Sequence, residues 1–177
     1  MGFPFLQMQM NWKQTFQMRK VVSNTTPIIT LLKIGKLDLL GELYGKVNVP
    51  QAVYREIEAG KDRDYYTDVG KLDWIDIVPI KSTSARLFLF DLDDGEAETI
   101  ILAQELAADI VIIDEKLGRR YAAQINIKVT GTLGILLKAK ECGIISTVAP
   151  FLHELREKSS WINNSLFEKA LHLAGEL

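Results

Sequence analysis

The 177-residue chain has little cysteine or histidine: one cysteine, Cys142, and two histidines, His153 and His172. A single cysteine cannot form a disulfide within the chain, so a reducing, cytoplasmic location is expected. Cys142 lies in an apolar helical stretch, which favours a buried structural thiol over a nucleophile. Both histidines lie in C-terminal stretches expected to be helical, where packing or surface roles are favoured over metal ligation. A zinc site built from thiolates and imidazoles is therefore not expected.

Long apolar runs and a large excess of one charge are absent as well. No stretch approaches the ~20 apolar residues of a membrane-spanning helix, so no membrane association is expected. The formal net charge of −2 excludes a generally basic nucleic-acid binder but leaves room for a local basic patch. With 47% hydrophobic and 25% charged residues, the chain has the composition of an ordinary globular protein.

The length favours one domain with a full core, preceded by a short segment of different character. Residues 1–17 lack the charged region followed by an apolar region that a secretory signal needs. Met18 and two basic residues then lead directly into an expected strand, which makes Met18 a candidate start. We expect residues 1–17 to be an N-terminal extension of unassigned role and residues 18–177 to form a single domain, including the C-terminal helices.

The middle of the chain contains the clearest structural pattern. Residues 97–106 are mostly apolar, which is typical of a helix covered by its neighbours. Residues 110–113 form a β-branched run too short for a helix, as in a central parallel strand buried on both faces. Asp114 and Glu115 follow at the carboxyl end of that strand, where open α/β sheets place their chemistry. Glu96, in the first turn of the preceding helix, starts from the same edge.

Strands and helices alternate along the chain, which predicts an α/β layered fold with a largely parallel sheet. Pro27 is expected at the first position of one helix, preceded by asparagine and threonine as cap candidates. Ser165 and Glu168 match a capping box. Residues 82–90 fit either a helix or an extended segment. The expected strands are 21–23, 47–49, 74–80, 110–113 and 127–129, and the expected helices are 28–34, 37–43, 51–59, 97–106, 117–124, 131–141, 146–157 and 165–173.

Four polar side chains are expected at one edge of this sheet. Clustered carboxylates repel one another and are costly to desolvate, so such a cluster usually implies a bound cation. Oxygen ligands without histidine or thiolate favour Mg²⁺ or Mn²⁺ over zinc. From spacing alone, an equal alternative is that each acid caps a helix or faces solvent. The four are Asn24 after the first strand, Glu56 in the second helical turn after the second strand, Glu96 at a helix start, and Asp114 after the fourth strand.

Six blocks of the sequence resemble a known family, the PIN-domain proteins called DUF3368, over roughly residues 18–176. The resemblance implies a three-layer α/β/α fold with a mostly parallel five-stranded sheet of order 3-2-1-4-5. It also implies a metal-dependent nuclease, because PIN domains are nucleases of which many are toxins in toxin–antitoxin pairs. The blocks are VVSNTTPIITLLKIGKLDLL at 21–40, VPQAVYREI at 49–57, GEAETIILA at 95–103, IIDEKLGRRYA at 112–122, TGTLGILLKAKECGII at 130–145 and SLFEKALHLAGE at 165–176.

The resemblance also implies roles for individual residues. Thr25 matches a hydroxyl beside the first acid of the family's site. At Asn24 the chain departs from the family, because an amide oxygen can coordinate a metal but brings no charge. The implied catalytic residues are Asn24, Glu56, Glu96 and Asp114, and the implied ligands of Mg²⁺ or Mn²⁺ are Glu96, Asp114, Glu115 and Asn24.

Basic residues close to Asp114 are candidates for binding substrate. Arg119 and Arg120 lie about one helical turn beyond it and could bind phosphate. Ion pairs with Glu115 or Glu98 are an equally weighted alternative for these arginines.

Three threonines complete the predicted substrate-binding set. Thr130 and Thr132 flank the start of a helix whose backbone amides could bind phosphate, although plain helix capping is favoured there. Thr25 joins them because of the family resemblance.

The predicted function is a Mg²⁺- or Mn²⁺-dependent endoribonuclease that cleaves single-stranded RNA, with a toxin held by a small antitoxin protein as the biological setting. The alternative is a non-catalytic PIN-like module that binds RNA or a protein partner, which Asn24 favours. A receiver-like switch domain fits poorly, because the chain offers no clean match to its acidic pocket and lysine. A homodimer is expected through the C-terminal helices, with Phe151, Leu155, Leu166 and Phe167 as the residues to watch.

Overall fold

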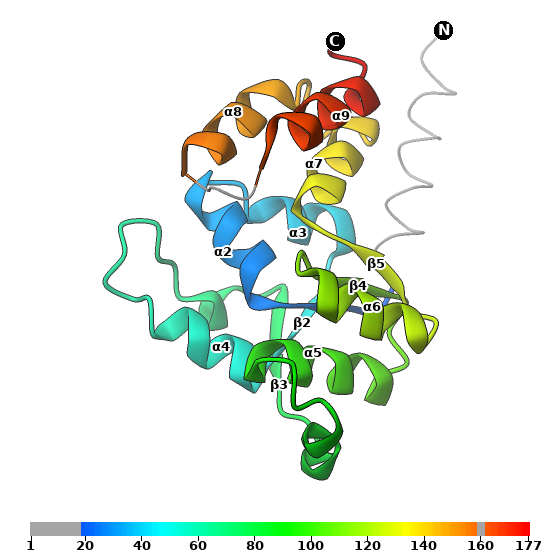
Figure 1. Ribbon diagram of the computed structural model, residues 1–177. Coiled ribbons are helices and arrows are strands. Elements are labelled where there is room, and N and C mark those ends of the chain that lie inside the picture. The colour runs from blue at the N-terminus through cyan, green and yellow to red at the C-terminus, as the bar shows by residue number, and fades with distance from the viewer. Residues whose placement is uncertain (1–18, 159–161) are drawn as a thin grey trace, which may run out of the picture.

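Five short strands pair side by side in the computed structural model, which describes residues 19–158 and 162–177 (Figure 1). Their order is β3-β2-β1-β4-β5, and every neighbouring pair is parallel. The fold class and the strand order expected from the sequence are confirmed. The strands are β1 (Val21–Ser23), β2 (Val47–Pro50), β3 (Ile75–Val78), β4 (Ile110–Ile112) and β5 (Lys128–Thr130).

The sheet is covered on both faces, because successive residues of its strands point to opposite sides. Val21 belongs to one buried cluster and Val22 to a second one, and both side chains are fully buried. The first cluster contains residues of α2 (Thr25–Lys33), α3 (Asp38–Tyr44), α4 (Gln51–Glu58), α7 (Thr132–Glu141), α8 (Ala149–Lys158) and α9 (Asn164–Ala174), and the second contains residues of α5 (Asp94–Glu105) and α6 (Lys116–Gln124).

Helix α2 begins earlier than the position of its proline indicates. Asn24 is the N-cap residue, and Pro27 is the third helical residue instead of the first. The first four backbone N–H groups of a helix have no partner within it, so proline at the third position removes no helical hydrogen bond. The expectation that Pro27 opens the helix is therefore wrong by two residues.

Two C-terminal helices, α8 and α9, begin at other residues than the sequence pattern predicts. Helix α8 begins at Ala149, after the expected start at residue 146. The capping box expected from Ser165 and Glu168 is wrong, because the N-cap of α9 is Asn163, whose side chain accepts from the N–H of Leu166 at 2.9 Å. The other expected elements are present with small shifts at their ends.

The ambiguous segment 82–90 forms a 3-10 helix, η2 (Thr83–Phe88), that protrudes from the molecule between β3 and α5 (Figure 1). Three large apolar side chains of this segment are mostly exposed: Leu87 at 77%, Phe88 at 79% and Phe90 at 87%. A second 3-10 helix, η1 (Val69–Lys71), lies between α4 and β3. No helix in the described residues is both long and apolar enough to cross a membrane.

Candidate active site

The predicted site residues come from the carboxyl ends of β1 and β4, which lie side by side. Ser23 pairs with Ile112 at the end of the two strands, and the N–H of Asn24 donates to the carbonyl oxygen of Ile112 at 2.9 Å. The two strands therefore end at the same edge of the sheet. Asn24 follows β1 there, and Asp114 follows β4.

Asn24 is buried, with 3% of its surface exposed, and both ends of its amide have partners. Its Nδ2 donates to Oε2 of Glu115 at 3.1 Å, and its Oδ1 accepts from the hydroxyl of Thr99 at 3.4 Å. An aspartate at this position has no N–H to donate and would face Glu115 as a second negative charge. The amide of Asn24 thus holds Glu115 in place without a cation.

Asp114 caps the start of helix α7. Its Oδ1 accepts from the N–H of Thr132 at 2.8 Å, and its Oδ2 accepts from the hydroxyl of Thr132 at 2.6 Å. Gly131 leaves room for this carboxylate, because a Cβ there would collide with Oδ1. The N-cap residue of α7 is Gly131, which has no side chain, so the acceptor for the N–H of Thr132 comes from the end of β4.

Glu96 forms a reciprocal capping box with Asp93 at the start of α5. The N–H of Glu96 donates to Oδ1 of Asp93 at 2.7 Å, and the N–H of Asp93 donates to Oε2 of Glu96 at 3.2 Å. The sequence reasoning missed Asp93, although the spacing of an acid three residues before a glutamate was a visible signal. It also missed Thr99, the partner of Asn24.

Glu56 lies on α4 and is held by two other elements. It accepts from the hydroxyl of Thr25 at the start of α2 and from the N–H of Gly95 in α5, the latter at 2.9 Å. A Cβ at Gly95 would lie 2.5 Å from Oε2 of Glu56, so only glycine permits this contact. Thr25, predicted to bind substrate, is thus placed as a partner of Glu56.

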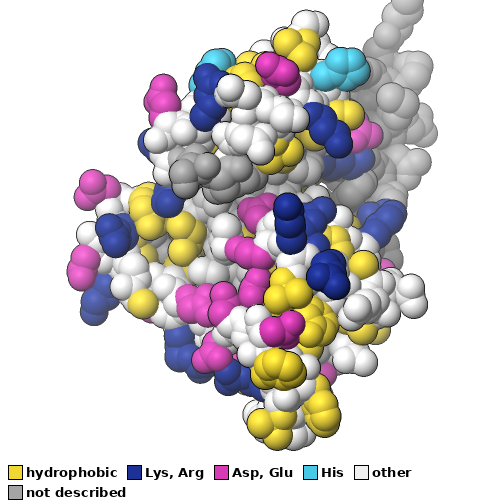
Figure 2. Space-filling model, in the orientation of Figure 1, with side chains coloured by type: hydrophobic (Ala, Val, Ile, Leu, Met, Phe, Trp, Pro, Cys, Tyr) yellow, Lys and Arg dark blue, Asp and Glu magenta, His cyan; other side chains and the backbone are white. Residues whose placement is uncertain are grey.

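Negative charge accumulates at this edge of the sheet. The pKa values of Glu56, Glu96 and Asp114 are all raised, in each case mainly by burial. Repulsion adds to this effect: Glu115 raises the pKa of both Glu96 and Asp114, while Asp93 raises that of Glu56. Figure 2 shows Asp and Glu side chains gathered across the middle of this face of the molecule.

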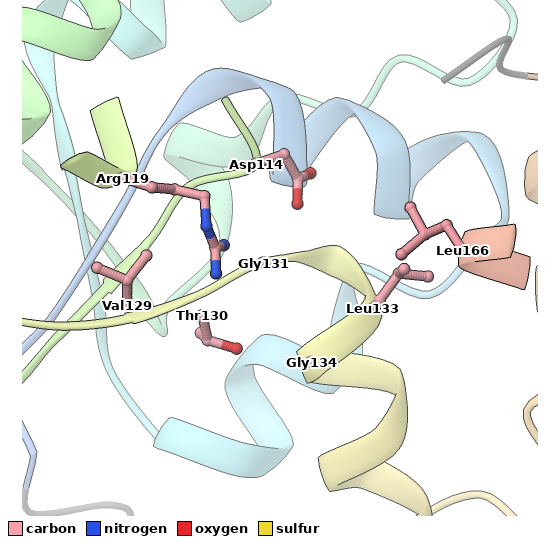
Figure 3. Close-up of a pocket in the computed structure, with 8 residues that line it drawn as sticks. All are labelled: Asp114, Arg119, Val129, Thr130, Gly131, Leu133, Gly134 and Leu166. Atoms are coloured by element: carbon pink, nitrogen blue, oxygen red, sulfur yellow. The ribbon is translucent and has the colours of Figure 1, made fainter. Parts of the chain in front are cut away.

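A pocket of about 420 Å³ opens beside Asp114 (Figure 3). Arg119 reaches into it and donates to the carbonyl oxygen of Ile113 at 2.8 Å, and Thr130 lines it from the end of β5. Arg120 is exposed on the surface and is not among the lining residues. The remaining walls are formed by Val129, Gly131, Leu133, Gly134 and Leu166.

Glu98 is not placed as an ion-pair partner of Arg119 or Arg120. It accepts from the N–H of Ala52 at 2.8 Å and lies 3.6 Å from the guanidinium of Arg55, both in α4. This half of the alternative considered for the two arginines is therefore not observed.

The oxygen donors at this edge are suited in kind to a hard divalent cation. Within residues 19–158 and 162–177, no three acidic, histidine or cysteine side chains are arranged as a ready-made ligand set. Each carboxylate is instead occupied by a hydrogen bond, for example Asp114 by Thr132 and Glu115 by Asn24. Burial and mutual repulsion raise the pKa values of three neighbouring acids, and oxygen donors of this kind fit Mg²⁺ or Mn²⁺.

The all-parallel sheet of order 3-2-1-4-5 and the helices on both faces define a three-layer α/β/α fold. The chain belongs to the DUF3368 family of PIN domains, whose family model matches residues 20–176. PIN domains generally use divalent metals and bind nucleic acids. No curated protein matches the chain.

Proposed function

We propose that the protein is an endoribonuclease of the PIN type that requires Mg²⁺ or Mn²⁺ and cleaves single-stranded RNA. The observation that carries the proposal is the cluster of buried and partly buried, mutually repelling acids where β1 and β4 end side by side. Such a cluster lowers the stability of the metal-free protein, and a bound cation would offset this loss. Acids with a purely structural role are expected to stabilise the protein without a cation.

The proposed roles divide between holding the cation and handling water. Glu96, Asp114, Glu115 and Asn24 would hold it, with carboxylates supplying charge and Asn24 supplying one neutral oxygen. A bound Mg²⁺ or Mn²⁺ polarises the phosphate and lowers the pKa of its water. Glu56 lies beside Gly95, one residue before Glu96, and its raised pKa suits a group that accepts a hydrogen bond or a proton from that water.

The pocket beside Asp114 is the proposed entry of the RNA strand. Arg119 presents a guanidinium there, and Arg120 is exposed on the same helix, so both are available to phosphate oxygens. Leu133 and Leu166 offer an apolar wall across the pocket from Arg119 (Figure 3), which suits the face of a base or a ribose. Thr130 offers a hydroxyl at the pocket floor.

Cleavage assays test the proposal. Single-stranded RNA and single-stranded DNA of one sequence are incubated with the wild type, Asp114→Asn and Asn24→Asp over a titration of Mn²⁺. We expect metal-dependent cleavage of RNA by the wild type, faster cleavage by Asn24→Asp and none by Asp114→Asn. Equal inertness of all three proteins, with no gain in metal binding by Asn24→Asp, would reject the nuclease.

A second candidate function is a non-catalytic module that binds a protein partner, for which a small antitoxin is the proposed occupant. The specific observation is the exposed patch of Leu87, Phe88 and Phe90, since contiguous exposed apolar side chains mark interaction surfaces. Co-expression with the product of a neighbouring small gene tests it. Retention of that product by the wild type, and its loss when the three residues are replaced by serine, would favour the module.

The proposed working unit is a single cytoplasmic domain of residues 18–177. The proposed N-terminal extension, residues 1–17, lies outside the described residues.

A further inference from the structure

Helices α4 and α5 each cap the start of the other. The N–H of Ala52, the second residue of α4, donates to Oε2 of Glu98 in α5 at 2.8 Å. The N–H of Gly95, the second residue of α5, donates to Oε1 of Glu56 in α4 at 2.9 Å. The two helices therefore run in opposite directions and are joined by two equivalent carboxylate-to-amide bonds.

Neither helix has a local side chain that could accept these hydrogen bonds instead. The N-cap of α4 is Pro50, which provides no side-chain hydrogen bond, so Glu98 supplies the missing acceptor. The N-cap of α5 is Asp93, whose side chain accepts from Glu96 and leaves the N–H of Gly95 for Glu56. A buried N–H group at the start of a helix is unfavourable when it has no acceptor. The two reciprocal hydrogen bonds provide an acceptor for one such N–H group in each helix.

Glu98 is well suited to hold this position. Only 5% of its surface is exposed, and its second oxygen lies 3.6 Å from the guanidinium of Arg55, one residue before Glu56. Its negative charge is therefore compensated by the amide end of α4 and by a cation on the same helix. It contacts α4 at both its first and its second turn.

The two reciprocal hydrogen bonds set the distance between Glu56 and Glu96, which are both predicted site residues. Glu56 lies on α4 one helical turn beyond Ala52, and Glu96 follows Gly95 directly in α5. A sliding movement of α4 along α5 would break both bonds and carry Glu56 away from Glu96. Because Glu96 is a proposed metal ligand and Glu56 is the proposed acceptor beside it, we expect this register to affect metal affinity.

We propose that Glu98 is a positioning residue that sets Glu56 against Glu96 through the reciprocal capping of α4 and α5. The role of Glu98 in metal affinity rests on the proposed function, whereas its role in placing Glu56 does not. The two can be separated by experiment.

Three variants of the full chain test the proposal at a temperature well below unfolding. Glu98→Ala removes the acceptor for Ala52. Glu98→Gln keeps an oxygen for that N–H and is the conservative rescue. Glu176→Ala is the matched control, because Glu176 caps α8 from a distance by accepting from Val148 and Ala149 at 2.7 and 2.8 Å.

Two readouts are measured for each variant: Mn²⁺ affinity by titration calorimetry and the amide resonance of Gly95 by NMR. We expect Glu98→Ala to bind Mn²⁺ at least about tenfold more weakly and to shift the Gly95 resonance. Glu98→Gln should resemble the wild type in both, and Glu176→Ala should lose thermal stability with neither readout changed. If Glu98→Ala does not fold, Glu98→Asp, whose carboxylate is one methylene farther from Ala52, replaces it with the same expected direction.

An unchanged Gly95 resonance in folded Glu98→Ala, or equal effects of Glu98→Ala and Glu176→Ala, would overturn the proposal. Absence of Mn²⁺ binding in the wild type would instead overturn the proposed function, while a shifted Gly95 resonance would still support the positioning of Glu56.

Discussion

At the scale of single residues, Asn24 changes what the site can do without a metal. Its amide donates to Glu115 and accepts from Thr99, so it reduces repulsion at the acidic edge instead of adding to it. Mg²⁺ and Mn²⁺ sites gain affinity from charged ligands, and removing one charge weakens the attraction by roughly 1–4 kcal/mol at 4 Å, depending on the local dielectric. If the proposed metal site is correct, Asn24 lowers the metal affinity and stabilises the metal-free protein.

Asn24→Asp is predicted to lower the stability of the metal-free protein and to raise its metal affinity. In the absence of metal the new carboxylate faces Glu115, so the melting temperature should fall. With saturating Mn²⁺ it should recover, and Mn²⁺ affinity should rise about tenfold, equivalent to about 1.4 kcal/mol. Thermal melting with and without Mn²⁺ measures both effects. Asn163→Asp, which keeps an oxygen acceptor at the exposed cap of α9, is the control and should respond to Mn²⁺ as the wild type does.

The titration of Asp114 gives a prediction with a defined sign. Its pKa in the folded protein is raised, chiefly by burial, so ionisation of Asp114 destabilises the fold. This loss is complete above the raised pKa and disappears as pH falls through it towards the unfolded value. Asp114→Asn should therefore be more stable than the metal-free wild type at neutral pH, by an amount on the order of 1 kcal/mol.

Urea unfolding of the two proteins between pH 4 and pH 7.5 measures this difference in free energy of unfolding, on the assumption of a two-state transition. The advantage of Asp114→Asn should shrink as the pH falls, because the protonated wild type then resembles the variant. A difference that does not depend on pH would contradict the assigned cause.

At the scale of helices and strands, the starts of several helices are held by acids from elsewhere in the chain. Glu98 caps α4, Asp114 caps α7 and Glu176 caps α8. Sequence patterns identified the helices themselves, because their apolar periodicity is a local property. These capping groups lie 18 to 46 residues away along the chain, so no local pattern could identify them. The cap of α9 is local, but Asn163 provides it instead of Ser165.

The site could be predicted in part for the same reason. The expected sheet edge brought Asn24, Glu96 and Asp114 to one region, since parallel strands share their carboxyl edge. The sequence could not show that Thr132 binds Asp114, that Thr25 binds Glu56, or that glycines make room for both acids. These contacts depend on helix packing across the sheet.

Thr132→Val is predicted to destabilise the protein, because it removes the hydrogen bond from the hydroxyl of Thr132 in α7 to Asp114. Valine has nearly the same shape but cannot donate to Asp114, and Thr132 is fully buried. The free energy of unfolding should fall by about 1 kcal/mol, the usual contribution of one hydrogen bond. Thr132→Ser keeps the hydroxyl and should lose less. Chemical denaturation of the three proteins decides between this outcome and a loss that depends only on side-chain volume.

At the scale of the whole molecule, two of the four C-terminal residues expected at a dimer surface are buried, whereas Phe151 and Leu166 are partly exposed. Leu155 is fully buried and Phe167 is 7% exposed, because both belong to the monomer's own core. They cannot form a dimer surface in this arrangement, so that part of the expectation is wrong. Three of the exposed large apolar residues, Leu87, Phe88 and Phe90, are close together at the protruding end of the molecule, which lies at the lower end of Figure 2.

Self-association is therefore predicted to depend on this protruding segment. Light scattering of the wild type at micromolar concentration should give a mass above the 20.0 kDa of one chain. Replacing Leu87, Phe88 and Phe90 with serine should return it to that value. Replacing Leu173 and Leu177, which are exposed elsewhere, is the matched control and should leave the mass unchanged. A wild type of 20.0 kDa throughout the range would count against a dimer.

The proposed nuclease activity requires the acidic edge between β1 and β4 to bind a divalent cation. Anomalous diffraction from a crystal soaked in Mn²⁺ measures this directly, because it locates the ion without assuming its ligands. We predict one ordered Mn²⁺ among Glu96, Asp114 and Glu115, with the Thr132 and Asn24 hydrogen bonds to these acids rearranged to admit it. An anomalous map with no peak at this edge, in a crystal where Mn²⁺ binds other sites, would contradict the claim.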